Sequence, residues 1–355
     1  MVSLLLTTVL AVSLGPVGPD AAHEPQLASS GSAVVMTFGA GKGIYFSASQ
    51  DGGTTFSKPV EVAEAEVIPL NRHRGPRIAL SGGTIVISAV VGKTLSEAEH
   101  AHGLPSDGDL TVWRSLDGGK KWSKGIVVND VPRAPTEGLH SLAADGKGNL
   151  FASWLDKRGG DGTKLYGAHS SDGGATWSKN VLIYQSPEGT ICECCHPSVA
   201  MDPSGQFLVM WRNWLGGARD MYLARSRDGV VFSKPEKLGT GTWQLNACPM
   251  DGGGMAATAA RTVTAWRRDE AIFLAEPGKQ ETQIGKGKDV ALALNKDQAY
   301  VSWTSGNEIV LWSNGRSEVL SKSGSYSALT SLPGGGVVTA WEENGAIEVR
   351  RLPHK

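Results

Sequence analysis

Three of the four cysteines in the 355-residue chain lie within four positions of one another, and their side chains are the ones most suited to chemistry. Cys192, Cys194 and Cys195 precede His196 in the sequence GTICECCHP, and Cys248 lies in the segment NACPMD. Cys194 and Cys195 are adjacent and cannot pair without strain, so a disulfide would join Cys248 to one of the three. The same five side chains are soft ligands for copper or zinc, and thiols also support redox reactions. Disulfide, metal and redox roles are all open.

The N-terminal segment bears on which of these roles is available. Residues 1–22 (MVSLLLTTVLAVSLGPVGPDAA) begin with an apolar run and end in glycine, proline and small residues. The run is shorter than the roughly 20 residues of a membrane-spanning helix, and it resembles a secretory signal that lacks a basic start. We therefore expect a secreted or periplasmic protein in an oxidising compartment, where disulfides can form.

Composition narrows the class of protein and its partners. The 34 basic and 35 acidic residues give a net charge of -1, which provides no electrostatic case for binding nucleic acid or an anionic membrane. Glycine is abundant (46 residues), and tryptophan (11 residues) is the commonest aromatic. This balance favours one large all-β domain over two domains of average size.

One turn pattern occurs four times along the chain. Each copy is a short β-type run that ends in Ser-x-Asp-Gly and is followed by an aromatic residue; the copies span 45–57, 112–123, 166–178 and 222–233. The Asp carboxylate can accept hydrogen bonds from N–H groups of the turn, and the aromatic ring can fold back beneath it.

A longer repeat unit of short strands contains these turns, and it recurs in the C-terminal part of the chain, where the turn pattern is absent. Seven copies of this unit begin near Gln26, Arg77, Ser141, Ser198, Met255, Val290 and Ser327. Short, evenly spaced strands without helical periodicity predict a β-propeller with one four-stranded sheet per unit. The last unit stops after its third strand, so we expect the N-terminal segment to supply the fourth. We predict one propeller domain over residues 23–355, with seven blades; six is the alternative.

The order of the turns assigns them to the two faces of this propeller. The Asp turns join the third and fourth strands of their blades, and the connections between blades lie on the opposite face. That opposite face collects both cysteine loops and the charged segments at 71–77, 94–109, 133–140, 156–158, 212–220 and 267–269. A propeller's ligand site is usually found at such a mouth.

The four turns resemble the Asp-box, Ser-x-Asp-x-Gly-x-x-Trp, of the sialidase-like propellers built from BNR repeats. Three copies match it fully or with Phe for Trp, and the copy at 226–232 is one residue short. The resemblance implies the fold but says little about function, because such turns also occur in propellers without enzymatic activity.

Other segments resemble the catalytic motifs of sialidases, in the same order: GPRIAL (75–80), SDGDL (106–110), YSAL (326–329) and AWE (340–342). The resemblance implies that Arg77 clamps a substrate carboxylate and that Tyr326 is the nucleophile. It also implies that Asp107 (or Asp109) is the acid/base. Glu342 would orient Arg77. Three guanidiniums can hold a sugar carboxylate through paired hydrogen bonds. Loop position alone gives the candidates for the other two: Arg212, Arg219 and Arg267.

The leading interpretation is a secreted exo-glycosidase that hydrolyses a terminal acidic sugar such as sialic acid and requires no cofactor. The alternative is a propeller without hydrolytic activity, whose mouth binds copper, zinc or another ligand. Its metal ligands would be Cys192, Cys194, Cys195, His196 and Cys248. The first interpretation expects a carbohydrate or small molecule at the mouth, and neither expects nucleic acid or a membrane.

Overall fold

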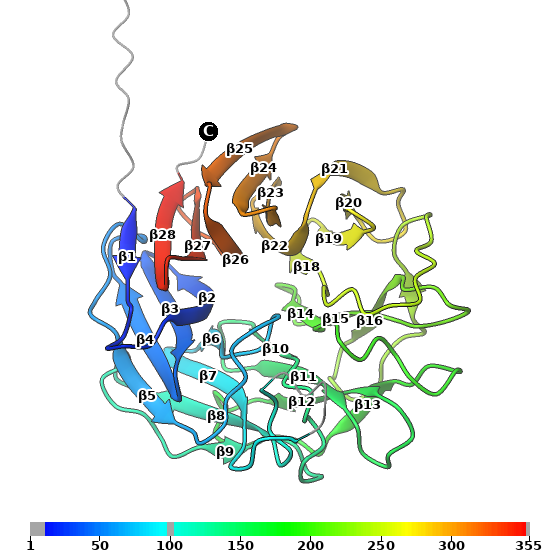
Figure 1. Cartoon of the computed structure of the whole chain (residues 1–355), viewed down its shortest axis with the longest axis horizontal. Helices are drawn as coiled ribbons and strands as arrows, with labels where there is room; N and C mark the ends of the chain where they lie inside the picture. Colours follow the sequence, from blue (N-terminus) through cyan, green and yellow to red (C-terminus); the bar gives the residue numbers. More distant parts are fainter. Residues whose placement is uncertain (1–10, 98–102, 353–355) are drawn as a thin grey trace, which may run out of the picture.

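The computed structural model describes residues 11–97 and 103–352, which form seven four-stranded sheets around a central axis (Figure 1). Neighbouring strands within each sheet are antiparallel. The all-β propeller and its seven blades, favoured by the repeat pattern, are therefore confirmed. The described residues contain no helix, and so none that is long and apolar enough to cross a membrane.

Each blade contributes one strand to each of four rings around the axis. The innermost strands are β2 (Ala22–Ser30), β6 (Arg77–Ser81), β10 (His140–Ala144), β14 (Ser198–Met201), β18 (Gly254–Ala257), β22 (Lys288–Asn295) and β26 (Gly324–Ser331). The second strands are β3 (Ala33–Ala40), β7 (Thr84–Val91), β11 (Leu150–Asp156), β15 (Phe207–Arg212), β19 (Thr262–Arg268), β23 (Gln298–Ser305) and β27 (Val337–Glu343). The third are β4 (Gly43–Ser49), β8 (Asp109–Ser115), β12 (Lys164–Ser170), β16 (Met221–Ser226), β20 (Ala271–Ala275), β24 (Glu308–Ser313) and β28 (Ala346–Leu352). The outermost are β5 (Val60–Glu64), β9 (Ile126–Val127), β13 (Val181–Tyr184), β17 (Glu236–Lys237), β21 (Thr282–Lys286), β25 (Arg316–Ser321) and β1 (Val12–Leu14).

Strands from both ends of the chain close the ring. β1 is the outer strand of the blade formed by β26, β27 and β28, with Val12 opposite Val349 and Leu14 opposite Ile347. The N-terminal segment therefore supplies the strand that the last repeat lacks. Residues 12–14 also fall inside the segment 1–22 that resembles a secretory signal, of which residues 1–10 lie outside the described part of the chain. The signal stays a prediction.

The Asp turns are held as their sequence predicts. In the first copy, Ser49 Oγ donates to Asp51 Oδ1 over 2.7 Å and accepts the Gly53 N–H over 2.8 Å. Asp51 Oδ1 also accepts the N–H groups of Thr54 and Thr55. The same Ser–Asp hydrogen bond recurs at 115–117, 170–172 and 226–228. Each turn lies between the third and fourth strands, so it points away from the blade-to-blade connections.

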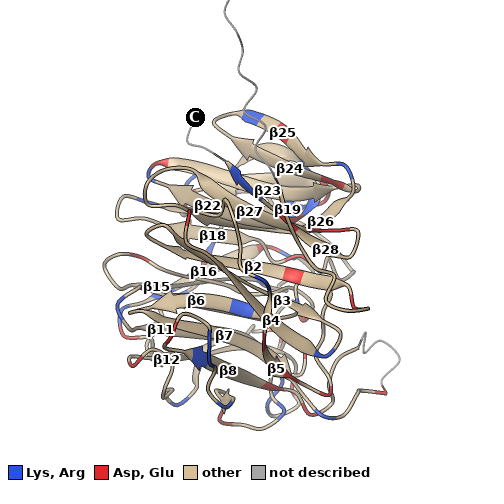
Figure 2. Cartoon of the chain, turned by 90° about the vertical axis from the view of Figure 1, so that its left-hand side faces the viewer, with Lys and Arg blue, Asp and Glu red and all other residues tan. Residues whose placement is uncertain are grey.

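The hydrophobic core fills the spaces between neighbouring blades. Val86 and Leu110 of one blade contact the cluster that contains Leu150 and Trp154 of the next. The second strands are covered on both faces, and for this reason they read as nearly continuous apolar runs such as FLVMW in β15. Charged residues lie mainly in loops and at strand ends (Figure 2).

Three innermost strands carry a β-bulge near their first residues. β2, β22 and β26 change register against their partners between residues 23 and 26, 288 and 291, and 325 and 328. Glu24, Asp289 and Tyr326 occupy these bulges with positive φ angles of 56°, 59° and 49°. Bulges re-aim side chains and are common beside active sites. The strained positions therefore mark this end of the central axis as a candidate site.

Candidate functional site

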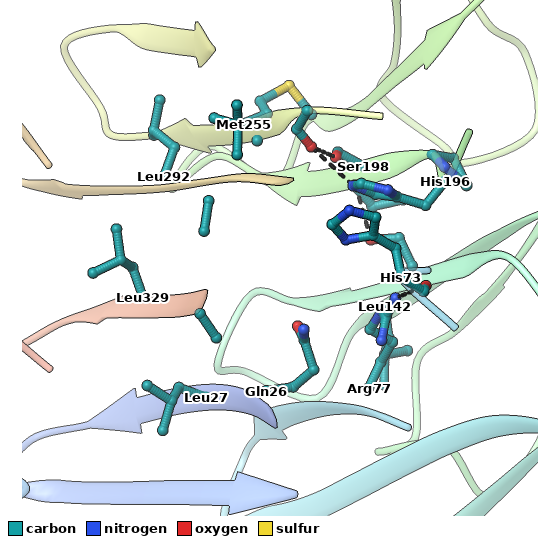
Figure 3. Close-up of a pocket in the computed structure, with 18 of the residues that line it drawn as sticks. Gln26, Leu27, His73, Arg77, Leu142, His196, Ser198, Met255, Leu292 and Leu329 are labelled. Atoms are coloured by element: carbon teal, nitrogen blue, oxygen red, sulfur yellow. Dashed lines mark hydrogen bonds between the residues drawn. The ribbon is translucent and has the colours of Figure 1, made fainter. Parts of the chain in front are cut away.

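His73 connects the bulge residues to the central cavity. Its Nε2 donates to Asp289 Oδ1 over 2.9 Å, and its ring lies edge-on to that of Tyr326, with centroids 5.3 Å apart. On the other side it lies 4.3 Å from the ring of His196, whose Nε2 bonds the Gly253 carbonyl (Figure 3). A phenol, an imidazole and a carboxylate from three different parts of the chain thus meet in one cluster.

Two cavities adjoin this cluster. The central one, of about 270 Å³, is lined by His73, Arg77 and His196 together with the innermost strands (Figure 3). The second, of about 260 Å³, lies between β22 and β26 and is lined by Asp289, Tyr326 and Lys288. Because His73 and Asp289 are hydrogen bonded, the two cavities share one pair of ionisable groups.

Asp289 and His73 stabilise each other's charged forms. Burial opposes a proton on the His73 ring, but the hydrogen bond and charge of Asp289 outweigh it and raise the pKa of His73. Burial likewise works against the Asp289 carboxylate, and His73 outweighs it and lowers the pKa of Asp289. Asp289 therefore stabilises the protonated form of the ring, which is a proton donor at the wall of the central cavity.

Asp251 lies beside this pair. Its Oδ2 accepts the Asp289 N–H over 3.0 Å, and its buried Oδ1 has no hydrogen-bond partner among the described residues. Burial and the charge of Asp289 raise the pKa of Asp251. The two carboxyls are best described as one coupled unit in which Asp289 holds the charge.

Glu24 is a third buried carboxyl of the cluster. Only 2 % of the residue is exposed, and its Oε1 accepts the His73 N–H over 2.8 Å. Burial raises its pKa to about 7, against the opposing charges of His73 and Arg77. Glu24 therefore changes its protonation state close to neutral pH.

This raised pKa makes stability depend on pH. The folded protein binds a proton at Glu24 between pH 4.5 and about 7, where the unfolded chain has released it. Ionisation of Glu24 therefore removes up to about 3 kcal/mol from the free energy of unfolding as pH rises through this window. Glu24→Gln, which cannot ionise, is expected to gain stability relative to the wild type from pH 4.5 to 7, measured by denaturant unfolding at several pH values. Glu61→Gln on the exposed strand β5 is the control. Parallel curves for Glu24→Gln and wild type would contradict the burial of this carboxyl.

The structure brings Arg77, Tyr326 and Glu342 to the same mouth, but not in the pairing that the resemblance implies. The Arg77 guanidinium donates to the backbone carbonyls of Gly75, Pro76 and His73. Glu342 instead accepts the Glu24 N–H over 2.7 Å and contacts His23 Nδ1 over 3.1 Å. Glu342 thus holds the β2 bulge in place, while Arg77 lines the central cavity.

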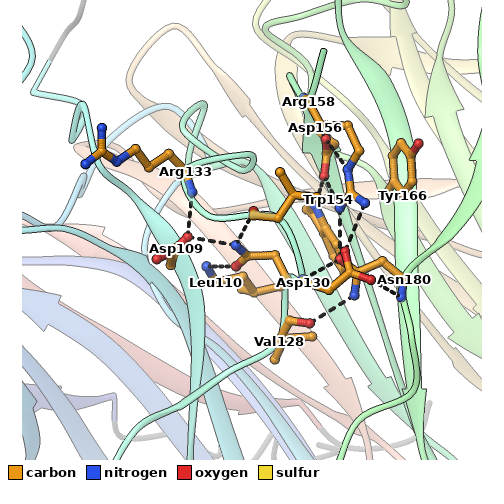
Figure 4. Close-up of polar contacts among 12 residues, drawn as sticks. Asp109, Leu110, Val128, Asp130, Arg133, Trp154, Asp156, Arg158, Tyr166 and Asn180 are labelled. Carbon is orange, nitrogen blue, oxygen red and sulfur yellow. Dashed lines mark hydrogen bonds and ion pairs between the residues drawn. The ribbon is translucent and has the colours of Figure 1, made fainter. Parts of the chain in front are cut away.

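Asp107 lines a different cavity from Tyr326. Its Oδ1 accepts the N–H groups of Lys93 and Thr94, and its side chain lines a cavity of about 600 Å³ together with Asp109 and Arg133. Asp109 accepts hydrogen bonds from Asn129 Nδ2 and the Arg133 N–H within a polar network at the edge of two blades (Figure 4). Asp107 and Asp109 thus hold their loops in place through hydrogen bonds.

The three arginines proposed as further clamps contact backbone and aromatic rings. Arg212 is 1 % exposed and donates to the carbonyls of Asp251, Arg219 and Arg267. Arg219 lies over the Trp214 ring at 4.6 Å, and Arg267 lies over the Trp243 ring at 5.5 Å. Lys288, which lines the Tyr326 cavity with 53 % of its side chain exposed, is the better-placed cation.

The three neighbouring cysteines form a compact buried set. Cys192 Sγ lies 2.9 Å from Cys195 Sγ and 3.7 Å from Cys194 Sγ, and the last two sulfurs are 4.0 Å apart. None of the four cysteines is in a disulfide, and Cys248 is exposed. His196 faces His73 and is not part of the set that could hold an ion.

Sequence reasoning missed Glu24 and Asp289, although a signal for both exists. Three innermost strands each line the central cavity with a leucine: Leu27, Leu292 and Leu329. Tyr326 lies three positions before its leucine, and Glu24 and Asp289 lie three positions before theirs. Aligning the blades on these residues identifies Glu24 and Asp289 as the counterparts of Tyr326. His73 and Asp251 lie in connections of unequal length and carry no such signal.

Several solved structures share this fold. The intramolecular trans-sialidase from Ruminococcus gnavus, solved with oseltamivir carboxylate, superposes with a TM-score of 0.52 at 13% identity and covers 94% of both chains. A polysaccharide lyase, an ulvan lyase bound to a saccharide that contains GlcA, gives a TM-score of 0.58 at 11% identity, covering 97% of this chain and 96% of its own. The α-L-arabinofuranosidase from Fusarium graminearum gives 0.51 at 14% identity and covers 97% of each chain.

Sequence comparison identifies the family directly. A search of curated proteins finds no match to this chain. The family described as the BNR repeat-like domain matches residues 43–338, which include all four Asp turns and most of the ring. The resemblance drawn from those turns is thereby confirmed, and the chain belongs to the BNR repeat-like domain family.

Proposed function

We propose that this protein is a carbohydrate-active propeller that cleaves an acidic glycan at its mouth. In its most specific form the proposal is an exo-glycosidase that hydrolyses a terminal acidic sugar such as sialic acid. The observation that carries it is the contact of Tyr326 with the hydrogen-bonded pair of His73 and Asp289, beside two cavities. The sialidase, ulvan lyase and arabinofuranosidase structures add support, because each of these proteins acts on a saccharide.

Tyr326 is suited to the role of nucleophile. Burial and three neighbouring carboxylates raise the pKa of its phenol, so the group is neutral at physiological pH. A neutral nucleophile can approach an anomeric carbon that carries a carboxylate, where a carboxylate nucleophile would be repelled. As the phenol oxygen bonds to the anomeric carbon and the leaving group departs, the phenol proton passes to a neighbouring carboxylate. Water then displaces the tyrosine oxygen, which takes a proton back and restores the phenol. The Arg72 N–H donates to this oxygen in the free protein.

The His73–Asp289 pair supplies the proton for the leaving group. His73 lines the central cavity, but its ring contacts Tyr326 and is hydrogen bonded to Asp289, and both of these residues line the second cavity. In this proposal the Asp289 charge stabilises the proton on the ring until the glycosidic oxygen takes it. This assigns to His73 the role that the sequence resemblance gives to Asp107. Lys288 lines the Tyr326 cavity and would meet the carboxylate of the sugar. The reaction requires no cofactor.

The experiment compares two carboxylates that the structure places in different cavities. Asp289→Asn keeps the acceptor for the His73 N–H but removes the charge, so kcat/KM for a fluorogenic sialoside or uronide is expected to fall by about 10²–10⁴-fold. Asp107→Asn is the matched control and should stay within a few-fold of wild type.

The products distinguish the outcomes. Hydrolysis adds water across the glycosidic bond, and mass spectrometry of the products should show that mass. An unsaturated sugar would instead indicate β-elimination and would overturn hydrolysis, although it would retain an acidic glycan as the substrate. Loss of activity in Asp107→Asn with full activity in Asp289→Asn would overturn the assignment of the site.

A further inference from the structure

We propose that Cys192, Cys194 and Cys195 bind one Cu(I) ion, which ties the cysteine loop to the wall of the mouth. The proposal is independent of glycan cleavage. It rests on the spacing of the three sulfurs, their burial, the charges around them and the absence of a fourth ligand from the set.

The spacing of the sulfur atoms suits a shared ion. Metal–sulfur bonds of about 2.3 Å place two thiolate ligands roughly 3.8–4.0 Å apart at tetrahedral or trigonal angles. The separations of 3.7 Å and 4.0 Å from Cys194 to its two neighbours match this range. The Cys192–Cys195 contact of 2.9 Å is shorter, so this pair must open by about 1 Å when the ion binds.

The three sulfurs are surrounded by an apolar side chain and by positively charged guanidiniums. The cysteines are 0 %, 7 % and 1 % exposed in chain order, and Met250 packs against them. The guanidiniums of Arg212 and Arg219 act electrostatically on Cys192, and that of Arg74 acts on Cys194. Three thiolates around a monovalent ion leave a net charge of about -2 in a buried place, and these arginines offset it.

The number of ligands favours copper over zinc. The set contains three sulfurs and no fourth ligand atom from the described residues. Cys248 is exposed, next to Cys194 but outside the set, and His196 faces His73. Zn²⁺ in structural sites almost always takes four ligands, whereas thiolates select the softer Cu(I).

Binding would fix the position of the loop relative to the catalytic cluster. The Cys192 N–H donates to the Arg212 carbonyl over 3.2 Å, and Cys195 directly precedes His196 in the chain. An ion held by three residues of this loop would hold the His196 ring against His73 without touching the glycan. The site is thus a clamp, and the glycan chemistry remains with His73, Asp289 and Tyr326.

The test loads the purified full-length protein with Cu(I) under anaerobic conditions and measures affinity by competition with a chromogenic Cu(I) chelator. We expect one Cu(I) per chain and about three sulfur neighbours by X-ray absorption spectroscopy. Cys194→Ser should weaken binding by more than the roughly 10–100-fold that loss of an outer-shell partner costs. Cys248→Ser is the matched control and should bind as tightly as wild type.

Each other outcome overturns the assignment. Four sulfur neighbours, with loss of binding in Cys248→Ser, would make it a four-ligand site of the kind that zinc prefers. A mass lower by two hydrogens and two unreactive thiols, without bound copper in the exported protein, would identify a disulfide instead. Because the sulfur count is measured on wild-type protein, the test does not depend on the folding of a variant.

Discussion

Tyr326→Phe is expected to lower kcat/KM for the acidic glycan by at least about 10²–10⁴-fold, the range that a positioned acid, base or nucleophile contributes. Phenylalanine keeps the ring beside His73 but removes the oxygen that would attack the sugar. The expected loss lies in kcat, because the ring still occupies the wall of the cavity. Steady-state kinetics on the substrate cleaved by the wild type measure both parameters.

Tyr222→Phe provides the control for this substitution. Tyr222 lies on β16 against Trp211, with ring centroids 6.2 Å apart, and lines neither cavity at the mouth. The control should retain wild-type kinetics. Tyr326→Phe should lower the free energy of unfolding only by the effect of one lost hydrogen bond, about 1 kcal/mol. Wild-type activity in Tyr326→Phe would remove tyrosine from the mechanism and leave His73 with Asp289 as the only reacting pair.

Arg212→Ala is expected to destabilise the fold by about 3–5 kcal/mol and to lower the melting temperature by roughly 5–10 °C. The side chain is 1 % exposed, and its three donors bond backbone carbonyls in three separate segments. Removing it leaves those carbonyls buried and unpaired. Arg212→Lys should recover only part of the loss, because an ammonium cannot reproduce the planar fork of the guanidinium.

Arg267→Ala is the control for the structural role of Arg212. Arg267 is only partly buried and donates to the Asp269 carbonyl, so its loss should cost about 1 kcal/mol or less. Calorimetry or chemical denaturation compares the two variants. Equal stabilities for Arg212→Ala and Arg267→Ala would contradict the role assigned to Arg212.

The propeller was predictable because its signals are local. Ser, Asp and Gly at fixed offsets specify each turn through contacts within a few residues, as between Ser49 and Asp51. The seven small-residue strands then follow at blade spacing, and the incomplete last unit indicates closure by the N-terminus. No long-range contact is needed to read these features.

The candidate site was predictable only in part, because it depends on which connections between blades meet at the central axis. Tyr326 and Arg77 followed from motif resemblance. His73 reaches Asp289 across 216 positions, and no pattern in the sequence pairs them. Asp107 lies in a segment that resembles a catalytic motif, but hydrogen bonds from the N–H groups of Lys93 and Thr94 hold it at a different cavity from Tyr326. Loop position could not show that the Arg212 guanidinium is buried.

The pairing of β1 with β28 joins the N-terminal and C-terminal strands of the ring. The last blade is completed only when β1 pairs with β28, so β1 has no partner until β28 has been synthesised. Processing that removed the chain through residue 22 would strip β1 and leave β28 as an exposed edge strand, which invites pairing with other chains. The closed ring therefore depends on residues 12–14 as much as on the seven repeats.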